Sequence, residues 1–350
     1  MGTGTRIAVL GTGANGAGIA ADLTRAGLDV SLIDQWPEHV DAMRRGGIQV
    51  TMPDRTETTR VQAYQLCDVA TMTKTFDIVF LVVNAYDTRW ATELIKPLLA
   101  DDGLVIGLQN GMTVADVLSI VGPEHTLGAV IEVASNMWEP GKVNRQTPPE
   151  ASWFAVGSVT PATAGREQEV ADVLRHAGTV EISDDIHSSK WMKLIANAAE
   201  HGPSAVLNVT IHAATQVPGM WDFMMECGTE AAQAAVADGA HLRPVLGMEQ
   251  GGDLGPAEYT KEVFGRVLSS FSTESTQGSV LQDLIKGRRS EIDDIHGHVV
   301  RTAERLGLDA PANAAVVQIG RKIELGQRRY GLHNVEALFE LRDELTHVPQ

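Results

Sequence analysis

The stretch Arg6–Ala20, RIAVLGTGANGAGIA, decides the fold of the first half of this chain. Its opening residues, Arg6–Leu10, form a short apolar run that predicts a buried strand, and Ala14–Ala26 has the periodicity of an amphipathic helix. Three glycines at the junction follow a G-x-G-x-x-G pattern. Between a strand and a helix, this pattern binds the pyrophosphate of a dinucleotide on the free N–H groups of the helix N-terminus.

Each glycine of this loop has its own physical role. Gly11 permits a tight turn, Gly13 lets a pyrophosphate approach the backbone, and Gly16 lets the helix pack against the strand. We expect the whole loop to contact the cofactor, and its residues are Gly11, Thr12, Gly13, Ala14, Asn15 and Gly16.

An acidic residue, Asp34, follows the loop by about twenty positions, at the end of the second predicted strand. A carboxylate there can accept hydrogen bonds from both ribose hydroxyls of NAD, and it repels the 2′-phosphate of NADP. The next basic residues, Arg44 and Arg45, come only at the end of the following helix. NAD is therefore the expected cofactor, with NADP less favoured. A second, compatible interpretation makes Asp34 the N-cap of the helix that begins near Pro37.

β-branched runs alternate with amphipathic stretches through the first half of the chain. The predicted strands are Arg6–Leu10, Asp29–Ile33, Asp77–Val83, Leu104–Leu108, Leu127–Val133, Trp153–Val159 and Thr179–Ile182. The predicted helices are Ala14–Ala26, Pro37–Arg45, Thr88–Leu99, Val114–Val121 and Arg166–His176. This alternation predicts right-handed βαβ units in an α/β Rossmann domain with a doubly wound, mostly parallel sheet.

After about residue 185 the strand signal gives way to Ala-rich helical periodicity. The predicted helices are Ser188–Glu200, Pro218–Gly239, Pro256–Leu268, Val280–Lys286, Glu291–Leu306 and Pro311–Leu325. We therefore expect two domains, a dinucleotide-binding domain over residues 1–185 and an all-helical domain over residues 186–350.

Composition narrows the classes of function. The formal net charge of −17 disfavours binding to nucleic acid or to an anionic membrane surface. The chain has two cysteines, in no metal or redox spacing, and no apolar run long enough to span a membrane. His296 and His298 lack a carboxylate set at zinc spacing, so no metal site is expected. These features predict a soluble cytoplasmic protein that acts on a small molecule.

The segment Lys190–His201, KWMKLIANAAEH, places Lys193, Asn197 and His201 four residues apart, on one face of an apolar helix. A lysine against apolar surface can have a lowered pKa and serve as a proton donor. The alternative is a snorkelling lysine with two polar cap residues near a helix end.

Four segments together resemble the ketopantoate reductases (2-dehydropantoate 2-reductases). These segments are RIAVLGTGANGAGIA at 6–20, LQNGM at 108–112, KWMKLIANAAEHGPSA at 190–205 and SVLQDLIKGRRSEIDDIHG at 279–297. The last two match the family's W-x-K-L-x-x-N and S-x-L-Q-D…G-R-x-x-E-I-D patterns, and the resemblance covers nearly the whole chain.

The resemblance implies a Rossmann domain joined to a helical domain, NAD(P)H-dependent reduction of a 2-oxo acid, and a homodimer built through the helical domain. It implies that Lys193 is the catalytic lysine and Glu291 the active-site glutamate. Asn110, Asn197 and Ser279 match positions that hold the substrate or orient the lysine, and Asn110 follows a strand at the edge where a cofactor also binds.

The chemistry supports these residue types independently. Hydride transfer to a ketone builds negative charge on its oxygen, which needs a proton donor such as Lys193. Alternatives from the residues alone make Asn110 part of a turn, Ser279 a helix N-cap, and Glu291 a member of a solvated cluster with Arg288 and Arg289.

The chain departs from the family pattern at two positions. NADP-dependent members carry a lysine where this chain has Asn84, so Asn84 is an expected cofactor contact and its neutrality favours NAD. The family pattern continues with asparagine where this chain has His201. His201 is an expected substrate-binding residue, as a switchable charge, a second acid/base group or a shape filler.

We therefore expect an NAD(H)-dependent oxidoreductase that interconverts a 2-oxo acid or related ketone with its hydroxy compound, using Lys193 as general acid/base. One alternative is a ketopantoate reductase of pantothenate biosynthesis. Another is a non-catalytic dinucleotide-binding sensor that has kept only the fold.

Overall fold

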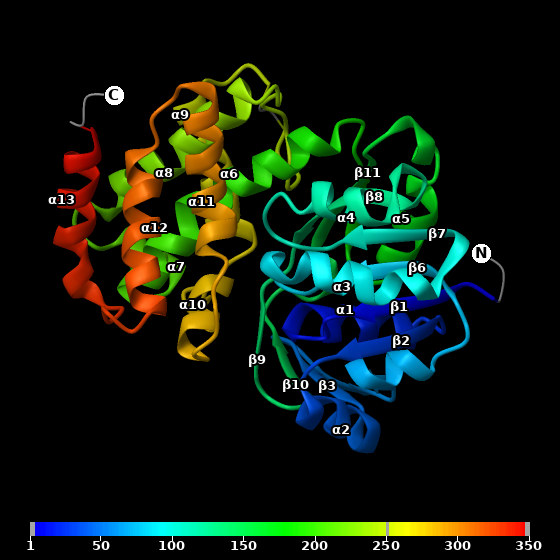
Figure 1. The fold of residues 1–350 in the computed structure, drawn as a ribbon. Helices are drawn as coiled ribbons and strands as arrows, with labels where there is room; N and C mark the ends of the chain where they lie inside the picture. Colours follow the sequence, from blue (N-terminus) through cyan, green and yellow to red (C-terminus); the bar gives the residue numbers. More distant parts are fainter. Residues whose placement is uncertain (1–3, 250–251, 347–350) are drawn as a thin grey trace. The chain divides into compact units, whose positions relative to one another are not determined.

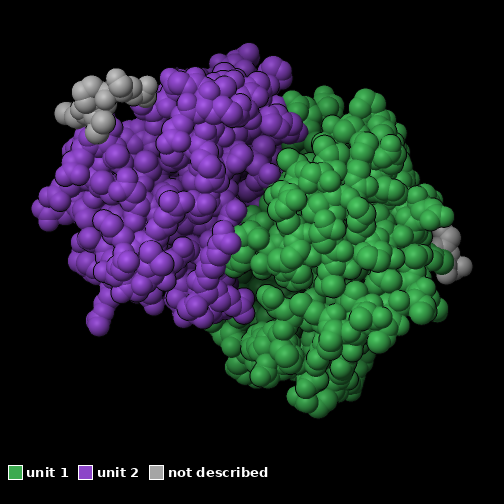
Figure 2. Space-filling view, in the orientation of Figure 1, with its two compact units in different colours: residues 1–109, 113–186 green, residues 110–112, 187–350 purple. Residues whose placement is uncertain are grey.

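Strand β1 (Arg6–Leu10) lies near the middle of an eight-stranded sheet in the computed structural model, which describes residues 4–249 and 252–346. Contacts divide the chain into two compact units, coloured separately in Figure 2. Unit 1 comprises residues 1–109 and 113–186, and unit 2 comprises residues 110–112 and 187–350. The short segment Asn110–Met112 thus belongs with the helical unit, although the chain on both sides of it belongs to unit 1.

The large sheet of unit 1 has the strand order β12-β11-β8-β7-β6-β1-β2-β5 (Figure 1). Its further strands are β2 (Asp29–Asp34), β5 (Gln62–Gln65), β6 (Phe76–Leu81), β7 (Leu99–Gly107), β8 (Thr126–Glu132), β11 (Trp153–Ser158) and β12 (Thr179–Ile182). All neighbouring strands are parallel except β8 and β11, which are antiparallel. The predicted mostly parallel sheet is confirmed.

Alternating side chains of the strands enter two separate cores, because successive residues of a strand point to opposite faces. Ile7 and Val9 pack into one core, with α1 (Ala14–Arg25), α2 (Pro37–Gly46) and α5 (Glu167–Leu174). Ala8 and Leu10 pack into the other core, with α3 (Thr88–Ile95) and α4 (Val114–Val121). Helices therefore cover both faces of the sheet, which explains the nearly continuous apolar strands.

A second, four-stranded sheet in unit 1 was not predicted. Its order is β4-β3-β10-β9, and its strands are β3 (Ile48–Thr51), β4 (Thr56–Thr59), β9 (Ser135–Glu139) and β10 (Lys142–Arg145). These strands have four or five residues each, too few for a clear alternation pattern. Their buried residues, including Val50 and Val143, join the same core as α1.

The described residues of unit 2 form helices and connecting loops, with no strand among them, as expected. Its helices are α6 (Ile186–Leu207), α7 (Ile211–Thr215), α8 (Met220–Ala237), α9 (Pro256–Ser270), α10 (Ser279–Ile285), α11 (Ile292–Leu306), α12 (Pro311–Glu324) and α13 (Val335–Thr346). None of the helices in the described ranges is long and apolar enough to cross a membrane.

The central helix α6 is longer than the sequence predicts. It passes through Pro203 and ends at Leu207, rather than ending at Glu200. His201 therefore lies inside a helix, and the alternative interpretation that it caps a helix end is wrong. Because proline lacks an N–H group, Pro203 usually ends or kinks a helix; here buried packing of residues on both sides keeps the segment helical.

Candidate functional site

The glycine loop has the shape expected of a pyrophosphate site. Gly11 has φ +91°, and a Cβ atom there would lie 2.7 Å from Val83 Cγ1. A Cβ on Gly16 would lie 2.1 Å from the Gly11 carbonyl oxygen, whereas one on Gly13 would meet no atom of the described residues within 4 Å. Packing inside the protein therefore requires glycine at 11 and 16, while open space at Gly13 leaves room for a ligand. This arrangement fits a bound dinucleotide.

The loop lies at the point where the strand order reverses. In the order β5-β2-β1-β6-β7-β8, the chain runs across the sheet in one direction from β1 through β2 to β5. It runs in the opposite direction from β6 through β7 to β8. Leu10 O accepts a hydrogen bond from Val82 N (2.8 Å), so the ends of β1 and β6 are adjacent. Open α/β sheets bind their ligands at such a switch point. Asn84 follows β6 there, and its Nδ2 donates to Tyr86 Oη (2.6 Å).

Asp34 fixes the glycine loop instead of capping a helix. Its Oδ2 accepts hydrogen bonds from the Thr12 N–H (2.6 Å) and the Thr12 hydroxyl (3.0 Å). Its Oδ1 accepts from the Trp36 N–H (2.9 Å), and Trp36 is the N-cap of α2, so the N-cap interpretation of Asp34 is wrong. A carboxylate has about four acceptor positions, which leaves capacity for a ribose hydroxyl.

A buried histidine that the sequence analysis missed also supports the loop. His39 Nδ1 accepts a hydrogen bond from the Gly141 N–H (2.9 Å), so the ring proton is on Nε2 and is donated to Thr12 O (2.8 Å). Burial lowers the pKa of His39, although the Asp34 charge opposes this effect. A neutral imidazole thus connects α2 to the loop. On the other side, Asn15 Oδ1 accepts a hydrogen bond from the Ser135 hydroxyl.

Helix α6 carries the predicted residues Lys193, Asn197 and His201, and their side chains are buried. Lys193 is 6% exposed and Asn197 is fully buried, so the lysine does not snorkel to solvent. The Lys193 ammonium lies 3.6 Å from Glu200 Oε1, and His201 Nε2 lies 3.6 Å from the same oxygen. Glu200 was not predicted. The sequence feature that could have identified Glu200 is its spacing of seven residues from Lys193, because residues two helical turns apart lie on the same face.

Asn110 contacts this face of α6. Asn197 Nδ2 donates to Asn110 Oδ1 (3.0 Å), which places the predicted loop residue beside the predicted helix residue within unit 2. Gly111, with φ +75°, makes the turn that follows. Asn197 Oδ1 is buried and has no hydrogen-bond partner among the described residues. A buried amide oxygen of this kind is available to a ligand that donates a hydrogen bond.

Ser279 and Glu291 are close to each other at the starts of α10 and α11. Ser279 Oγ donates to Glu291 Oε2 (3.4 Å). Ser279 is the first residue of α10 and Gly278 is its N-cap, so the N-cap interpretation of Ser279 is wrong. Glu291 is only 3% exposed, which rules out the solvated cluster with Arg288 and Arg289.

Glu291 acts electrostatically on a second buried lysine that was not predicted, Lys190. Burial lowers the pKa of Lys190 to about 8, and the charge of Glu291 favours its protonated form. His201 lies against the start of α10, because a Cβ on Gly278 would be 2.6 Å from His201 Nδ1. We call the following set the α6 cluster: Asn110, Lys190, Lys193, Asn197, Glu200, His201, Ser279 and Glu291. It contains two lysines, two carboxylates and four further polar side chains, all within unit 2.

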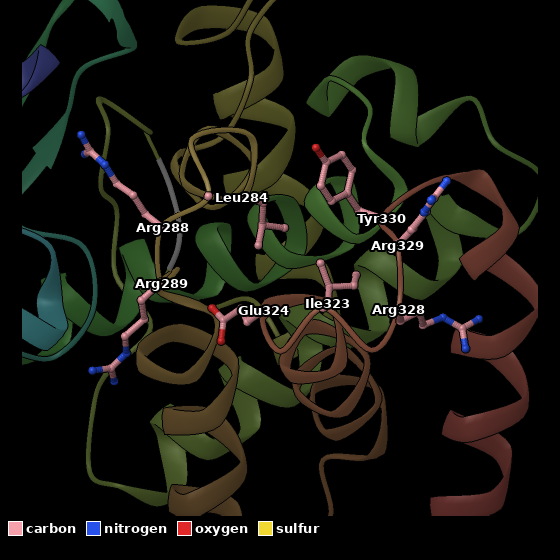
Figure 3. A pocket seen from close by; sticks show the side chains of 10 residues that line it. Leu284, Arg288, Arg289, Ile323, Glu324, Arg328, Arg329 and Tyr330 are labelled. Carbon is pink, nitrogen blue, oxygen red and sulfur yellow. The ribbon is translucent and has the colours of Figure 1, made fainter.

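A pocket of about 720 Å³ in unit 2 contains none of the predicted site residues (Figure 3). Arg288 and Arg289 extend from the segment before α11, and Arg328 and Arg329 from the segment after α12, with guanidinium groups pointing away from one another. Glu324 in its wall accepts hydrogen bonds from Ser290 N (2.8 Å) and Ser290 Oγ (2.6 Å). This contact fixes the residue next to Glu291. No group of three or more possible metal ligands occurs in residues 4–249 and 252–346.

A glycine loop at the switch point of a Rossmann sheet, with a buried lysine–carboxylate cluster in a following helical unit, is typical of a nicotinamide-dependent oxidoreductase. Comparison with known proteins gives the family. The model described as "Ketopantoate reductase PanE/ApbA" matches residues 7–158, and that of its C-terminal part matches residues 185–324. The chain belongs to the ketopantoate reductase PanE/ApbA family.

Individual relatives agree with this assignment. The chain is 27% identical to a 2-dehydropantoate 2-reductase of Archaeoglobus fulgidus, over 92% of this chain and 98% of the relative. It is also 27% identical to that of Lactococcus lactis, over 87% and 94%. Among solved structures, a PanE/ApbA family ketopantoate reductase from Ralstonia eutropha JMP134 has 28% identity and a TM-score of 0.75, over 92% and 99%.

A more distant structure shares the fold. D-mandelate dehydrogenase, solved with NADH and anilino(oxo)acetate, has a TM-score of 0.81 and 22% identity, over 92% of this chain and 99% of that one. The predicted family and the predicted fold class are confirmed. The chain is accordingly an NAD(P)-dependent oxidoreductase that acts on a CH–OH group of a small molecule.

Proposed function

We propose that this protein is an NAD(H)-dependent oxidoreductase that interconverts a 2-oxo acid, or a related ketone, with its hydroxy compound, with Lys193 as general acid/base. One observation carries the proposal: a buried lysine lies within 3.6 Å of a buried carboxylate, on a helix face that also presents Asn197 and His201. A lysine held this way can exchange a proton with a substrate oxygen in a site that excludes water.

The roles of the other residues follow from their chemistry. The nicotinamide cofactor, when bound along the glycine loop, supplies or accepts the hydride. During reduction the carbonyl oxygen becomes negative, and the Lys193 ammonium transfers a proton to it and becomes neutral. The Asn197 amide and the Ser279 hydroxyl can bind the substrate carboxylate without adding charge. Glu291 can accept a hydrogen bond from a substrate or ribose hydroxyl, and Asn110 can contact either ligand.

The test of this proposal is Lys193→Ala. We expect kcat for ketone reduction to fall between about a hundredfold and ten-thousandfold, because the proton donor is lost, with little change in NADH binding. A panel of hydroxy acids with NAD, followed by NADH absorbance, selects the substrate. Reduction of the corresponding ketone is then followed by the loss of NADH absorbance, and binding by NADH fluorescence. Lys142→Ala is the matched control, since Lys142 is an exposed lysine in unit 1. Unchanged turnover by Lys193→Ala would refute the role of Lys193.

We also propose that NADH is preferred over NADPH. Asp34 is held by Thr12 and Trp36 at the ribose end of the expected site, and Asn84, in the loop that follows β6, is neutral. A fixed carboxylate repels a 2′-phosphate, and Asn84 gives no positive charge to compensate. We expect kcat/KM for NADH to exceed that for NADPH by more than about tenfold, the equivalent of about 1.4 kcal/mol. A clear preference for NADPH would contradict this proposal.

Ketopantoate is the second candidate substrate, because the curated relatives are named 2-dehydropantoate 2-reductases. The histidine at position 201 is the main reason to place it second. Turnover of ketopantoate with NADH at low substrate concentration would make it the first candidate. A dinucleotide sensor without catalysis is disfavoured, because Lys193 and Glu291 are both buried among polar partners. A homodimer and a cytoplasmic location remain predictions from the family resemblance.

A further inference from the structure

Glu200 is a buried carboxylate that no motif in the sequence identifies. Its side chain is 2% exposed, and one oxygen, Oε1, lies 3.6 Å from both the Lys193 ammonium and His201 Nε2. The other oxygen, Oε2, is buried and has no hydrogen-bond partner among the described residues. The carboxylate therefore joins the expected proton donor to the histidine that departs from the family pattern.

Glu291 is not the only carboxylate near the lysines of α6, because Glu200 lies on the helix itself. Glu291 is the charged group that favours the protonated form of Lys190, another lysine of α6. Within the α6 cluster, Glu291 thus acts electrostatically on Lys190, and Glu200 lies 3.6 Å from the Lys193 ammonium. Burying an isolated charge is costly, so each ammonium needs an opposite charge beside it. Glu200 meets that requirement for Lys193.

We propose that Glu200 is a positioning residue for Lys193: through Oε1 it holds the ammonium and the His201 imidazole together and keeps Lys193 protonated for transfer to the substrate oxygen. This inference rests on the proposed role of Lys193 as proton donor. An opposite charge within about 4–6 Å favours the charged form of a titratable group, by one to three pKa units.

Several titratable groups surround Lys193. Lys190, Glu200 and His201 lie on α6 itself. From α11, His296 interacts electrostatically with His201, and Glu291, which precedes the same helix, interacts electrostatically with Lys190. His296 is neutral near pH 7, because burial lowers its pKa to about 4. Burial raises the pKa of Glu200, and the neighbouring Lys193 charge opposes this effect. Glu200, 3.6 Å from the ammonium, is therefore the carboxylate whose removal acts directly on Lys193.

The experiment is the pH profile of kcat for ketone reduction in Glu200→Gln. Activity falls as the pH rises through the pKa of Lys193, because only the ammonium can donate. Removing the carboxylate lowers that pKa, so the alkaline limb should move to lower pH by about one to three units. Glu200→Asp retains the charge at a greater distance, and we expect a smaller shift in the same direction.

Glu230→Gln is the matched control. Glu230 is also a buried carboxylate of unit 2, but it accepts hydrogen bonds from Ala312 N, Asn313 N and Asn313 Nδ2, away from Lys193. We expect this variant to lower the melting temperature and to leave the alkaline limb in place. A structural role for Glu200 would make the two variants behave alike.

The outcomes separate this inference from the proposed function. An unmoved limb in Glu200→Gln, with Lys193→Ala inactive, overturns the role of Glu200 alone. Normal turnover in Lys193→Ala overturns the proposed function itself. If Glu200→Gln does not fold, as circular dichroism would show, Glu200→Asp decides: a shift to lower pH supports the inference, and an unmoved limb overturns it.

Discussion

Gly16 and Gly13 belong to the same loop but have different surroundings. A substitution at Gly16 should therefore affect the stability of the fold, and one at Gly13 should affect ligand binding. A Cβ on Gly16 would lie 2.1 Å from a backbone oxygen, whereas one on Gly13 would meet no described atom within 4 Å. We expect Gly16→Ala to destabilise the fold by about 1–3 kcal/mol, because backbone must move. We expect Gly13→Ala to change stability by less than about 0.5 kcal/mol but to weaken NADH binding more than tenfold.

Thermal unfolding and NADH fluorescence titration measure these two effects. Position 13 has a φ of −59°, outside the left-handed region that favours glycine. Wild-type affinity in Gly13→Ala would show that the pyrophosphate does not approach this residue.

Residues of the α6 cluster were predictable where spacing or a motif identified them. Lys193, Asn197 and His201 recur every four residues, and the structure places all three in the cluster. Lys190 was missed because its tertiary surroundings, rather than a motif, distinguish it from a surface charge, whereas the seven-residue spacing of Glu200 from Lys193 was a signal that the prediction did not use. His39 was missed for the same reason as Lys190: a single histidine in a helix carries no spacing signal, and its contacts with Thr12 and Gly141 come from distant parts of the sequence.

Elements with a clear apolar run or helical periodicity were the most predictable part of the fold, whether buried, as β1 is, or largely exposed at the sheet edge, as β12 is. The bounds of β1, β12 and α4 agree with prediction, because apolar runs and helical periodicity define them. The second sheet was not predictable, partly because β10 ends in a buried charge. Arg145 is 1% exposed; its guanidinium pairs with Asp22 and donates to Ala177 O (2.8 Å). An arginine in the core contradicts the hydrophobic pattern on which strand prediction depends.

The stability of the whole molecule should depend on pH through buried neutral histidines. His296 is fully buried and its Nδ1 donates to Asn313 Oδ1 (2.8 Å), because the Asn313 amide nitrogen already donates to Cys227 O and Glu230 Oε2. Its folded pKa of about 4 lies below the ordinary value of 6.5. The unfolded chain therefore binds this proton more readily, and its contribution is present above pH 6.5 and is lost as the pH falls towards 4.

We expect this one histidine to reduce the free energy of unfolding by about 2–3 kcal/mol between pH 7 and pH 4.5. Urea unfolding at the two pH values measures the loss. His296→Asn keeps a donor for Asn313 but cannot titrate, so its loss over the same interval should be smaller by that amount. Equal losses in the variant and the wild type would exclude His296 as a cause.

The grouping of Asn110–Met112 with the helical unit has a consequence for the order of events during synthesis. A ribosome completes residues 1–109 and 113–186 before most of α6 has been made. The hydrogen bond between Asn110 and Asn197 cannot form until Asn197, 87 positions later in the chain, has left the ribosome. N-terminal domains generally fold first. The nascent sheet can therefore form early, while its central loop matures only when the downstream half arrives, so premature termination after residue 186 would leave that loop without its partner.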